Sequence, residues 1–336
     1  MTQQFSLFGD PVAAPGDEDT APRLVTAAAH DQATVDLAAS LPRSLHLGTS
    51  SWYFPGWNGI VFGEACDAGR LSRDGLAAYS AHPLLRCVSI DRTYYAPMDA
   101  TSLAGYAAQV PDDFRFMVKA PAECTTPFLR GADGRAAGAN PRYFDPTHAT
   151  ERFVLPTLAG LGDKCGPLVF QFPPQGHPIV REPERFAEKL YAFLAGLPQG
   201  PLYAVELRDA GLLSRRYVQA LRATQMRHCL SVHPRASPLA DQLAALRVLE
   251  PGPLVARWNL NPAHQYQEAK ERFSPFDRLM EEDPESRAAL ADACADALSA
   301  NRPVFLIANN KAEGSAPLTI GKLAVAIDAR LALPRG

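Results

Sequence analysis

The chain contains 336 residues, 47% of them hydrophobic and 21% charged, which is enough material for one large core. A formal net charge of -3 at pH 7 supplies no general attraction to nucleic acid, so any anion-binding surface must be local. Six cysteines without C-x-x-C spacing argue against a zinc ribbon or a small disulfide scaffold. The sequence shows neither a secretory leader nor an apolar run of the ~18 to 20 residues that span a bilayer, so we expect a cytoplasmic protein.

The first 43 residues differ in character from the rest of the chain. They are rich in Ala, Pro, Asp and Thr and show no sustained hydrophobic periodicity. This composition predicts a flexible tail over residues 1–43, followed by a single folded domain over residues 44–336.

From Leu45 onward, short apolar runs alternate with amphipathic stretches. Helix-like periodicity is found at 71–82, 149–161, 183–195, 214–224, 238–249, 285–300 and 317–331. The runs that predict strands are 45–49, 86–90, 114–118, 167–170, 202–205, 228–232, 254–258 and 303–308.

Eight strands alternating with helices indicate right-handed crossovers and a parallel sheet. A count of eight favours closure into a single (β/α)8 TIM-type barrel, an α/β fold, over an open doubly wound sheet. The Rossmann alternative expects G-x-G-x-x-G after an early strand. The first strand instead runs into Gly48-Thr49-Ser50-Ser51-Trp52-Tyr53, so we expect no dinucleotide cofactor.

Polar residues follow the predicted strands, where TIM barrels keep their active sites. One such residue is often only a satisfied ion pair, but joint contributions from the ends of several strands favour a site. The residues are Thr49, Ser51 and Trp52, Asp91 and Arg92, Lys119, Gln171, Glu206 and Arg208, His233, Arg257 and Asn259, and Asn309 and Asn310.

Three chemistries make different demands on this cluster. A multi-metal phosphoesterase needs converging His, Asp and Glu ligands, and Lys119, Arg208 and Arg257 would repel a divalent ion, so we expect no metal and no cofactor. A Schiff-base lyase needs a lysine with a lowered pKa, and Lys119 beside Glu206 is a candidate. An anion pocket needs guanidinium, ammonium and amide donors, which this set supplies best.

Several segments resemble one known family, the YecE-like proteins of domain-of-unknown-function family 72. The resemblance implies a TIM barrel over about residues 45–330 and implies no particular activity. It rests on Leu47-Gly48-Thr49-Ser50-Ser51-Trp52 with Trp57, Phe114-Arg115-Phe116-Met117-Val118-Lys119-Ala120-Pro121, Gly166-Pro167-Leu168-Val169-Phe170-Gln171-Phe172-Pro173-Pro174, Val205-Glu206-Leu207-Arg208, and Asn309-Asn310 with Gly314 and Ala316-Pro317.

The chain also departs from the family pattern. The family typically reads V-E-x-N-x-T-F-Y where this chain has Val88-Ser89-Ile90-Asp91-Arg92-Thr93-Tyr94-Tyr95, so the Glu is lost and Asp replaces Asn. The usual T-H after the lysine motif is Thr125-Thr126, and H-P-S-W is absent at Asp209-Ala210-Gly211-Leu212. The resemblance therefore implies a divergent member, which either binds its ligand without turnover or uses Asp91 in place of the Glu.

A short motif lies in the predicted tail. Gln4-Phe5-Ser6-Leu7-Phe8 is similar to the Q-L-S/D-L-F pentapeptide by which bacterial replication and repair proteins dock on the sliding clamp. In that interpretation Leu7 and Phe8 enter an apolar pocket while the Gln4 amide binds at its rim. It would link the barrel to DNA metabolism. The alternative is that the tail packs on the barrel.

The leading hypothesis is a barrel enzyme for a phosphate- or carboxylate-bearing ligand. Arg208, Arg257 and Lys119 would hold the anion, and Glu206 or Asp91 would act as general acid or base. The other ligand-binding residues would be Gln171, Trp52, Asn309 and Asn310. The alternatives are a non-catalytic, nucleic-acid-associated adaptor recruited by the clamp, and a Schiff-base lyase that uses Lys119.

Overall fold

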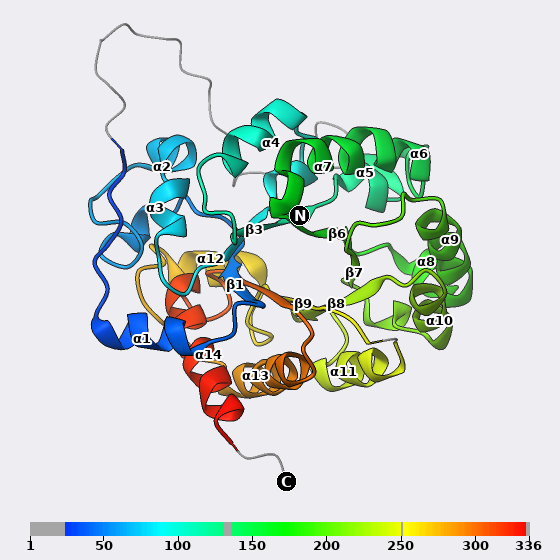
Figure 1. The fold of residues 1–336 in the computed structure, drawn as a ribbon. Coiled ribbons are helices and arrows are strands. Elements are labelled where there is room, and N and C mark those ends of the chain that lie inside the picture. Colours follow the sequence, from blue (N-terminus) through cyan, green and yellow to red (C-terminus); the bar gives the residue numbers. More distant parts are fainter. Residues whose placement is uncertain (1–23, 131–135, 250, 334–336) are drawn as a thin grey trace, which may run out of the picture.

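The computed structural model describes residues 24–130, 136–249 and 251–333. Eight parallel strands close into a barrel in the order β1-β10-β9-β8-β7-β6-β3-β2, and helices surround it (Figure 1). The predicted TIM-type barrel is therefore confirmed. The barrel strands are β1 (Leu45–Thr49), β2 (Cys87–Ile90), β3 (Arg115–Lys119), β6 (Cys165–Phe172), β7 (Tyr203–Leu207), β8 (Arg227–Val232), β9 (Leu254–Trp258) and β10 (Val304–Ala308).

All eight predicted strands are present, each within a few residues of its expected bounds. The predicted helix at 71–82 is divided at Gly75, the C-cap of one short helix and the N-cap of the next. The helices are α1 (Gln32–Ser40), α2 (Ala68–Asp74), α3 (Leu76–Ser80), α4 (Ala100–Ala107), α5 (Ala122–Thr125), α6 (Pro146–Ala149), α7 (Leu155–Leu161), α8 (His177–Val180), α9 (Pro183–Ala195), α10 (Arg215–Ala223), α11 (Leu239–Val248), α12 (Tyr266–Phe273), α13 (Pro284–Ser299) and α14 (Ala316–Leu331).

The sequence did not predict α1, which lies inside the stretch expected to be a flexible tail. Residues 24–43 are folded: the Asp31 side chain caps α1 by accepting from the Thr34 amide, and Ser40 Oγ donates to Asp328 on α14 at 2.7 Å. The two helices lie side by side (Figure 1). Because α1 is stabilised by these tertiary contacts, its own weak periodicity gave no signal.

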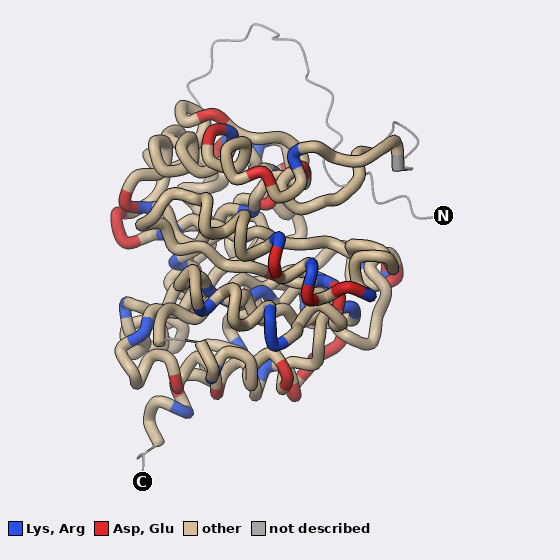
Figure 2. Tube along the Cα trace, turned by 90° about the vertical axis from the view of Figure 1, so that its right-hand side faces the viewer, with Lys and Arg blue, Asp and Glu red and all other residues tan. Residues whose placement is uncertain are grey.

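A two-stranded antiparallel sheet, β4 (Phe128–Arg130) and β5 (Ala136–Ala139), stands apart from the barrel in the connection between β3 and β6. Elsewhere lysines and arginines alternate with acidic residues along the visible side of the molecule (Figure 2). This mixture of signs agrees with the small net charge.

Two apolar layers hold the barrel together. Outward-facing strand residues pack against the helices, and a separate cluster fills the inside of the barrel. The inner cluster consists of Cys87, Met117, Val169, Ala204, Cys229, Val255, Phe305 and Ile307, all buried. It forms a solid floor below the C-terminal ends of the strands, so a site at those ends is closed from beneath.

Candidate functional site

On the barrel strands other than β1, the inward face changes from apolar to polar toward the C-terminal end. Side chains alternate between the two faces of a strand, so residues two apart share a face. On β7, Ala204 in the apolar floor is followed by Glu206, and on β9, Val255 is followed by Arg257. The same step leads to Ser89 and Asp91 after Cys87, Lys119 after Met117, Gln171 after Val169, Ser231 after Cys229, and Asn309 after Ile307.

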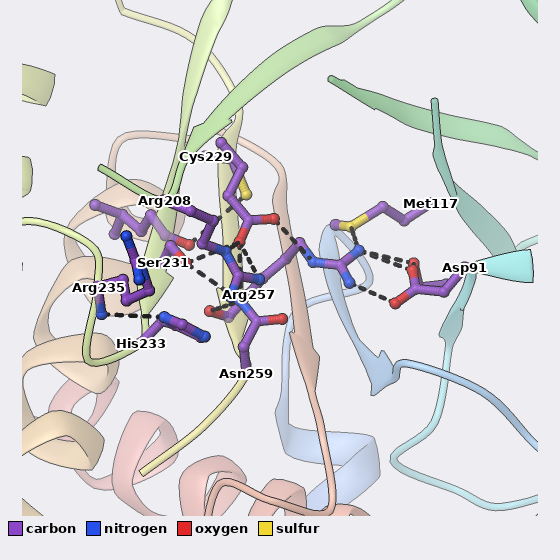
Figure 3. Close-up of polar contacts among 12 residues, drawn as sticks. Asp91, Met117, Arg208, Cys229, Ser231, His233, Arg235, Arg257 and Asn259 are labelled. Atoms are coloured by element: carbon purple, nitrogen blue, oxygen red, sulfur yellow. Dashed lines mark hydrogen bonds and ion pairs between the residues drawn. The ribbon is translucent and has the colours of Figure 1, made fainter. Parts of the chain in front are cut away.

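Glu206 is the centre of the polar layer and is fully buried. Its Oε1 accepts from Arg208 Nε at 2.7 Å, from Ser231 Oγ at 2.8 Å and from Asn259 Nδ2 at 3.0 Å. Its Oε2 lies 3.2 Å from Arg257 Nε, an ion pair whose alignment falls short of a hydrogen bond. Figure 3 shows these donors converging from three neighbouring strand ends.

Arg257 crosses the mouth of the barrel to reach Asp91. Its Nη2 donates to Asp91 Oδ2 at 2.6 Å and its Nη1 to Asp91 Oδ1 at 3.0 Å, a two-point guanidinium–carboxylate pair (Figure 3). The same Nη1 lies 3.0 Å from Ser89 Oγ. With its third nitrogen facing Glu206, the Arg257 guanidinium is used entirely by protein groups, and its side chain is only 2% exposed.

Both carboxylates are held in the ionised form. Burial alone would raise the pKa of Asp91, but the charges of Arg257 and Lys119 outweigh burial and lower it to about 2. Burial likewise opposes ionisation of Glu206, and the charges of Arg208, Arg257 and Lys119 lower the pKa of that carboxyl below its usual value. The predicted use of either group as a general acid is therefore not supported by its surroundings.

Lys119 has a different environment from the two arginines. Its Nζ lies 3.7 Å from the centroid of the Tyr94 ring, and within the described residues no carboxylate oxygen lies within 4 Å of it. Tyr94 is positioned by its neighbour Thr93, whose Oγ1 donates to the Lys119 carbonyl at 2.6 Å. Burial lowers the pKa of Lys119 to about 7, although the charge of Asp91 acts in the opposite direction.

A small cavity opens between the ends of β1 and β2, beside Asp91. Its volume of about 10 Å³ is close to that of one water molecule. Trp52 lines it, is 1% exposed, and has an indole N–H with no acceptor among the described residues. The remaining lining residues are Ser50, Ser51, Tyr53, Ser89, Ile90, Asp91 and Arg92.

Comparison with models of known protein families shows the family of this chain. The family model described as protein of unknown function DUF72 matches residues 46–335. The chain belongs to the DUF72 family. This confirms the resemblance to the YecE-like proteins that the strand-end motifs suggested.

Solved DUF72 structures share the architecture. A DUF72 family protein from Thermotoga maritima matches with 19% identity and a TM-score of 0.57, covering 84% of this chain and 99% of that one. A DUF72 family protein from Enterococcus faecalis matches with 18% identity and a TM-score of 0.54, covering 87% of this chain and 97% of that one. At these identities the likeness concerns the fold alone. No curated protein matches the chain in a sequence search.

The other ligand-binding residues predicted for this DUF72 member have mixed placements. Trp52 lines the cavity, and Gln171 is buried at the end of β6 opposite Glu206 in the strand register. Asn309 and Asn310 stabilise the loops instead. Asn309 Nδ2 donates to Ser50 Oγ at 2.8 Å, and Asn310 Oδ1 accepts from the indole of Trp57 and from the Ala316 amide.

Sequence reasoning missed Lys311, the residue directly after the Asn-Asn motif. Lys311 is 6% exposed, and its Nζ lies 4.6 Å from the centroid of the Tyr266 ring on α12. Burial and the charge of Lys270 lower the pKa of Lys311 to about 8, against the opposing effect of Asp91. The signal was its position one residue beyond Asn310, the last strand-end residue counted, so a wider window would have included it.

Three remaining predictions concern partners, metals and location. Gln4, Leu7 and Phe8, and with them the docking peptide, lie outside the described residues. Across 24–130, 136–249 and 251–333, no group of three or more His, Cys, Asp or Glu side chains is arranged to hold a metal ion. In the same ranges, no helix combines the length and the apolar character that crossing a bilayer requires.

Proposed function

We propose that this DUF72 protein is an enzyme acting on a small carboxylate- or phosphate-bearing ligand, bound at the C-terminal ends of the barrel strands. The charge balance supports this proposal. Lys119, Arg208 and Arg257 face two carboxylates, Asp91 and Glu206, so the polar layer carries one uncompensated positive charge when Lys119 is protonated. A buried excess of positive charge is satisfied by an anionic ligand.

The observation that carries the proposal is the ammonium of Lys119 on the Tyr94 ring, without a carboxylate partner. Arg257 and Arg208 are already paired with Asp91 and Glu206, so in this proposal the arginines shape the site and Lys119 contacts the ligand. A pKa of about 7 also matches proton transfer at neutral pH, which makes Lys119 the general acid or base.

The test is an NMR titration of protein carrying 13C-labelled lysine. One lysine signal should titrate near pH 7, below the signal of Lys311 near pH 8, and should be absent from Lys119→Met. Saturating inorganic phosphate, and separately acetate, should raise the pKa reported by that signal by about one unit, because an anion stabilises the ammonium by about 1.4 kcal/mol per unit. Lys322→Met, which removes an exposed lysine paired with Glu282, is the matched control. If neither anion changes the pKa reported by the Lys119 signal, the proposal is refuted.

A second candidate, a Schiff-base lyase, is favoured by the same lysine environment. An amine with a pKa of about 7 is largely unprotonated at pH 8 and is a nucleophile. Its Nζ would attack a carbonyl carbon. An imine forms as the carbonyl oxygen is released as a water molecule. Borohydride then adds hydride to the imine and fixes the ligand on the protein.

Trapping of a covalent adduct distinguishes the Schiff-base role of Lys119 from its role as general acid or base. Wild-type protein incubated with pyruvate and borohydride at pH 8 should gain the mass of the reduced adduct on the peptide that contains Lys119, and Lys119→Met should gain none. Failure to trap an adduct with pyruvate or with a small aldehyde such as glyceraldehyde, while phosphate still raises the pKa of Lys119, would select the acid–base role.

A further inference from the structure

A second lysine lies at the same mouth, in the loop after β10. Lys311 is almost completely buried, and its Nζ is held over the Tyr266 ring as Lys119 is held over Tyr94. Within the described residues, neither ammonium lies within 4 Å of a carboxylate oxygen, whereas Arg208 and Arg257 are both paired. Lys311 is buried and Lys119 is partly buried, and removing an ammonium group from water without a partner is costly, so two such residues at one mouth require an explanation.

The strand order places the two lysines on either side of the cavity. Around the barrel the sequence of strands is β10, β1, β2, β3. Lys311 follows β10 and Lys119 ends β3, so the ends of β1 and β2 lie between them, and these ends line the cavity beside Trp52 and Asp91. Burial lowers the pKa of both lysines, and the charge of Asp91 acts in the opposite direction on each.

The segment that carries Tyr266 is fixed over these loops. Phe54, which follows β1, and Tyr266 pack against the apolar cluster of α12 and its flanks. At Gly56 a Cβ atom would lie 1.9 Å from the Pro275 carbonyl oxygen, so the chain after α12 touches the loop after β1 backbone to backbone. The ring that supports Lys311 is therefore held by packing, and the ammonium has a defined position.

We infer that Lys311 is a second ligand-binding cation, and that the site takes a small ligand with two anionic groups, one held by Lys119 and the other by Lys311. This inference rests on the proposed function and narrows its ligand class to diphosphates, dicarboxylates or phosphorylated carboxylates. The ligand lies above the ends of β1 and β2 and outside the cavity, whose volume of about 10 Å³ has room for one water molecule only; Trp52 lines that cavity. The aromatic ring that each ammonium group contacts orients it without neutralising it.

The experiment measures binding of inorganic phosphate and of pyrophosphate by calorimetry at pH 7, in wild-type protein and in variants of Lys119, Lys311 and Lys322. Wild-type protein should bind pyrophosphate at least about tenfold more tightly than phosphate, because a second ion pair forms. Lys311→Met should lose that preference while its phosphate affinity changes by less than about threefold. Lys119→Met should weaken both ligands, and Lys322→Met should weaken neither.

The outcomes distinguish the two proposals. If Lys311→Met leaves the pyrophosphate affinity unchanged while Lys119→Met weakens binding, the role of Lys311 as a second ligand-binding cation is refuted. The proposed function is then unaffected. If Lys119→Met changes the affinity for neither phosphate nor pyrophosphate, the proposed function itself is refuted. Because Lys311→Met removes a buried group, Lys311→Arg serves as the conservative variant, and it should recover most of the pyrophosphate preference by restoring the charge.

Discussion

Arg257 binds both carboxylate oxygens of Asp91 although β10 and β1 lie between their strands around the barrel. The pair joins residues 166 positions apart in sequence and fixes the polar layer across the barrel mouth. Since the guanidinium also faces Glu206, the ion pair connects the two carboxylates through a single cation.

Asp91→Asn should lower the free energy of unfolding by about 3 kcal/mol, because the buried Arg257 guanidinium loses its two-point partner and keeps Glu206 as its one carboxylate neighbour. Urea denaturation at pH 7 measures this change. Asp163→Asn is the matched control: Asp163 is exposed, and its substitution should change stability by no more than about 0.5 kcal/mol. Equal stability of the two variants would contradict the role given to Asp91.

The contribution of Asp91 to stability should decrease in acid. Its pKa of about 2 in the folded protein lies below its ordinary value of 3.8, so the pairing stabilises the fold above that value. The stabilisation is lost as the pH falls from about 4 toward 2, where the carboxylate protonates in the folded state also. The difference in unfolding free energy between wild type and Asp91→Asn should shrink by about 2 kcal/mol between pH 7 and pH 2.

Lys119→Met should change how stability depends on alkaline pH. The pKa of Lys119 in the folded protein, about 7, lies below its ordinary value of 10.5. Between these values the unfolded chain binds the proton that the folded protein has released, so stability rises with pH. Relative to Lys119→Met, wild-type protein should gain about 1.4 kcal/mol per pH unit between pH 7.5 and 9.5. Parallel stability curves for the two proteins would show that Lys119 titrates normally.

Two glycine substitutions should have opposite effects. At Gly48 a Cβ atom would lie 1.9 Å from the Cys87 carbonyl oxygen on the neighbouring strand, so Gly48→Ala should cost at least about 3 kcal/mol. At Gly105, on an exposed turn of α4, a Cβ atom would meet nothing within 4 Å. Gly105→Ala should therefore raise stability by about 0.5–1 kcal/mol through helix propensity. Thermal unfolding of both variants checks the pair.

The strands and the barrel were predictable because their signal is local. Each strand is a buried apolar run, and the rule that sites lie at strand C-terminal ends led directly to Lys119, Glu206 and Arg257. Which charged side chains pair with one another was not predictable. Nothing local in the sequence indicates that Arg257 pairs with Asp91 instead of a ligand, because that preference depends on which strand ends meet across the closed barrel.

The segments that the sequence missed are those whose stability comes from tertiary contacts. α1 has a single buried residue, Ala38, whose carbonyl accepts from Arg86. α12 is short and polar, and the apolar cluster around Phe273 holds it near the strand ends. Lys311 was overlooked for a related reason: its importance comes from Tyr266 on that unpredicted helix.

The order of the barrel strands also has a consequence for synthesis of the chain. β1, the first barrel strand made, takes β10, the last, as one of its two neighbours. Until the ribosome has released Val304–Ala308, one edge of β1 has no backbone partner, and such edges recruit strands from other chains. A product that stops before Val304 should therefore aggregate instead of forming a smaller barrel, which makes complete translation a condition of solubility for this fold.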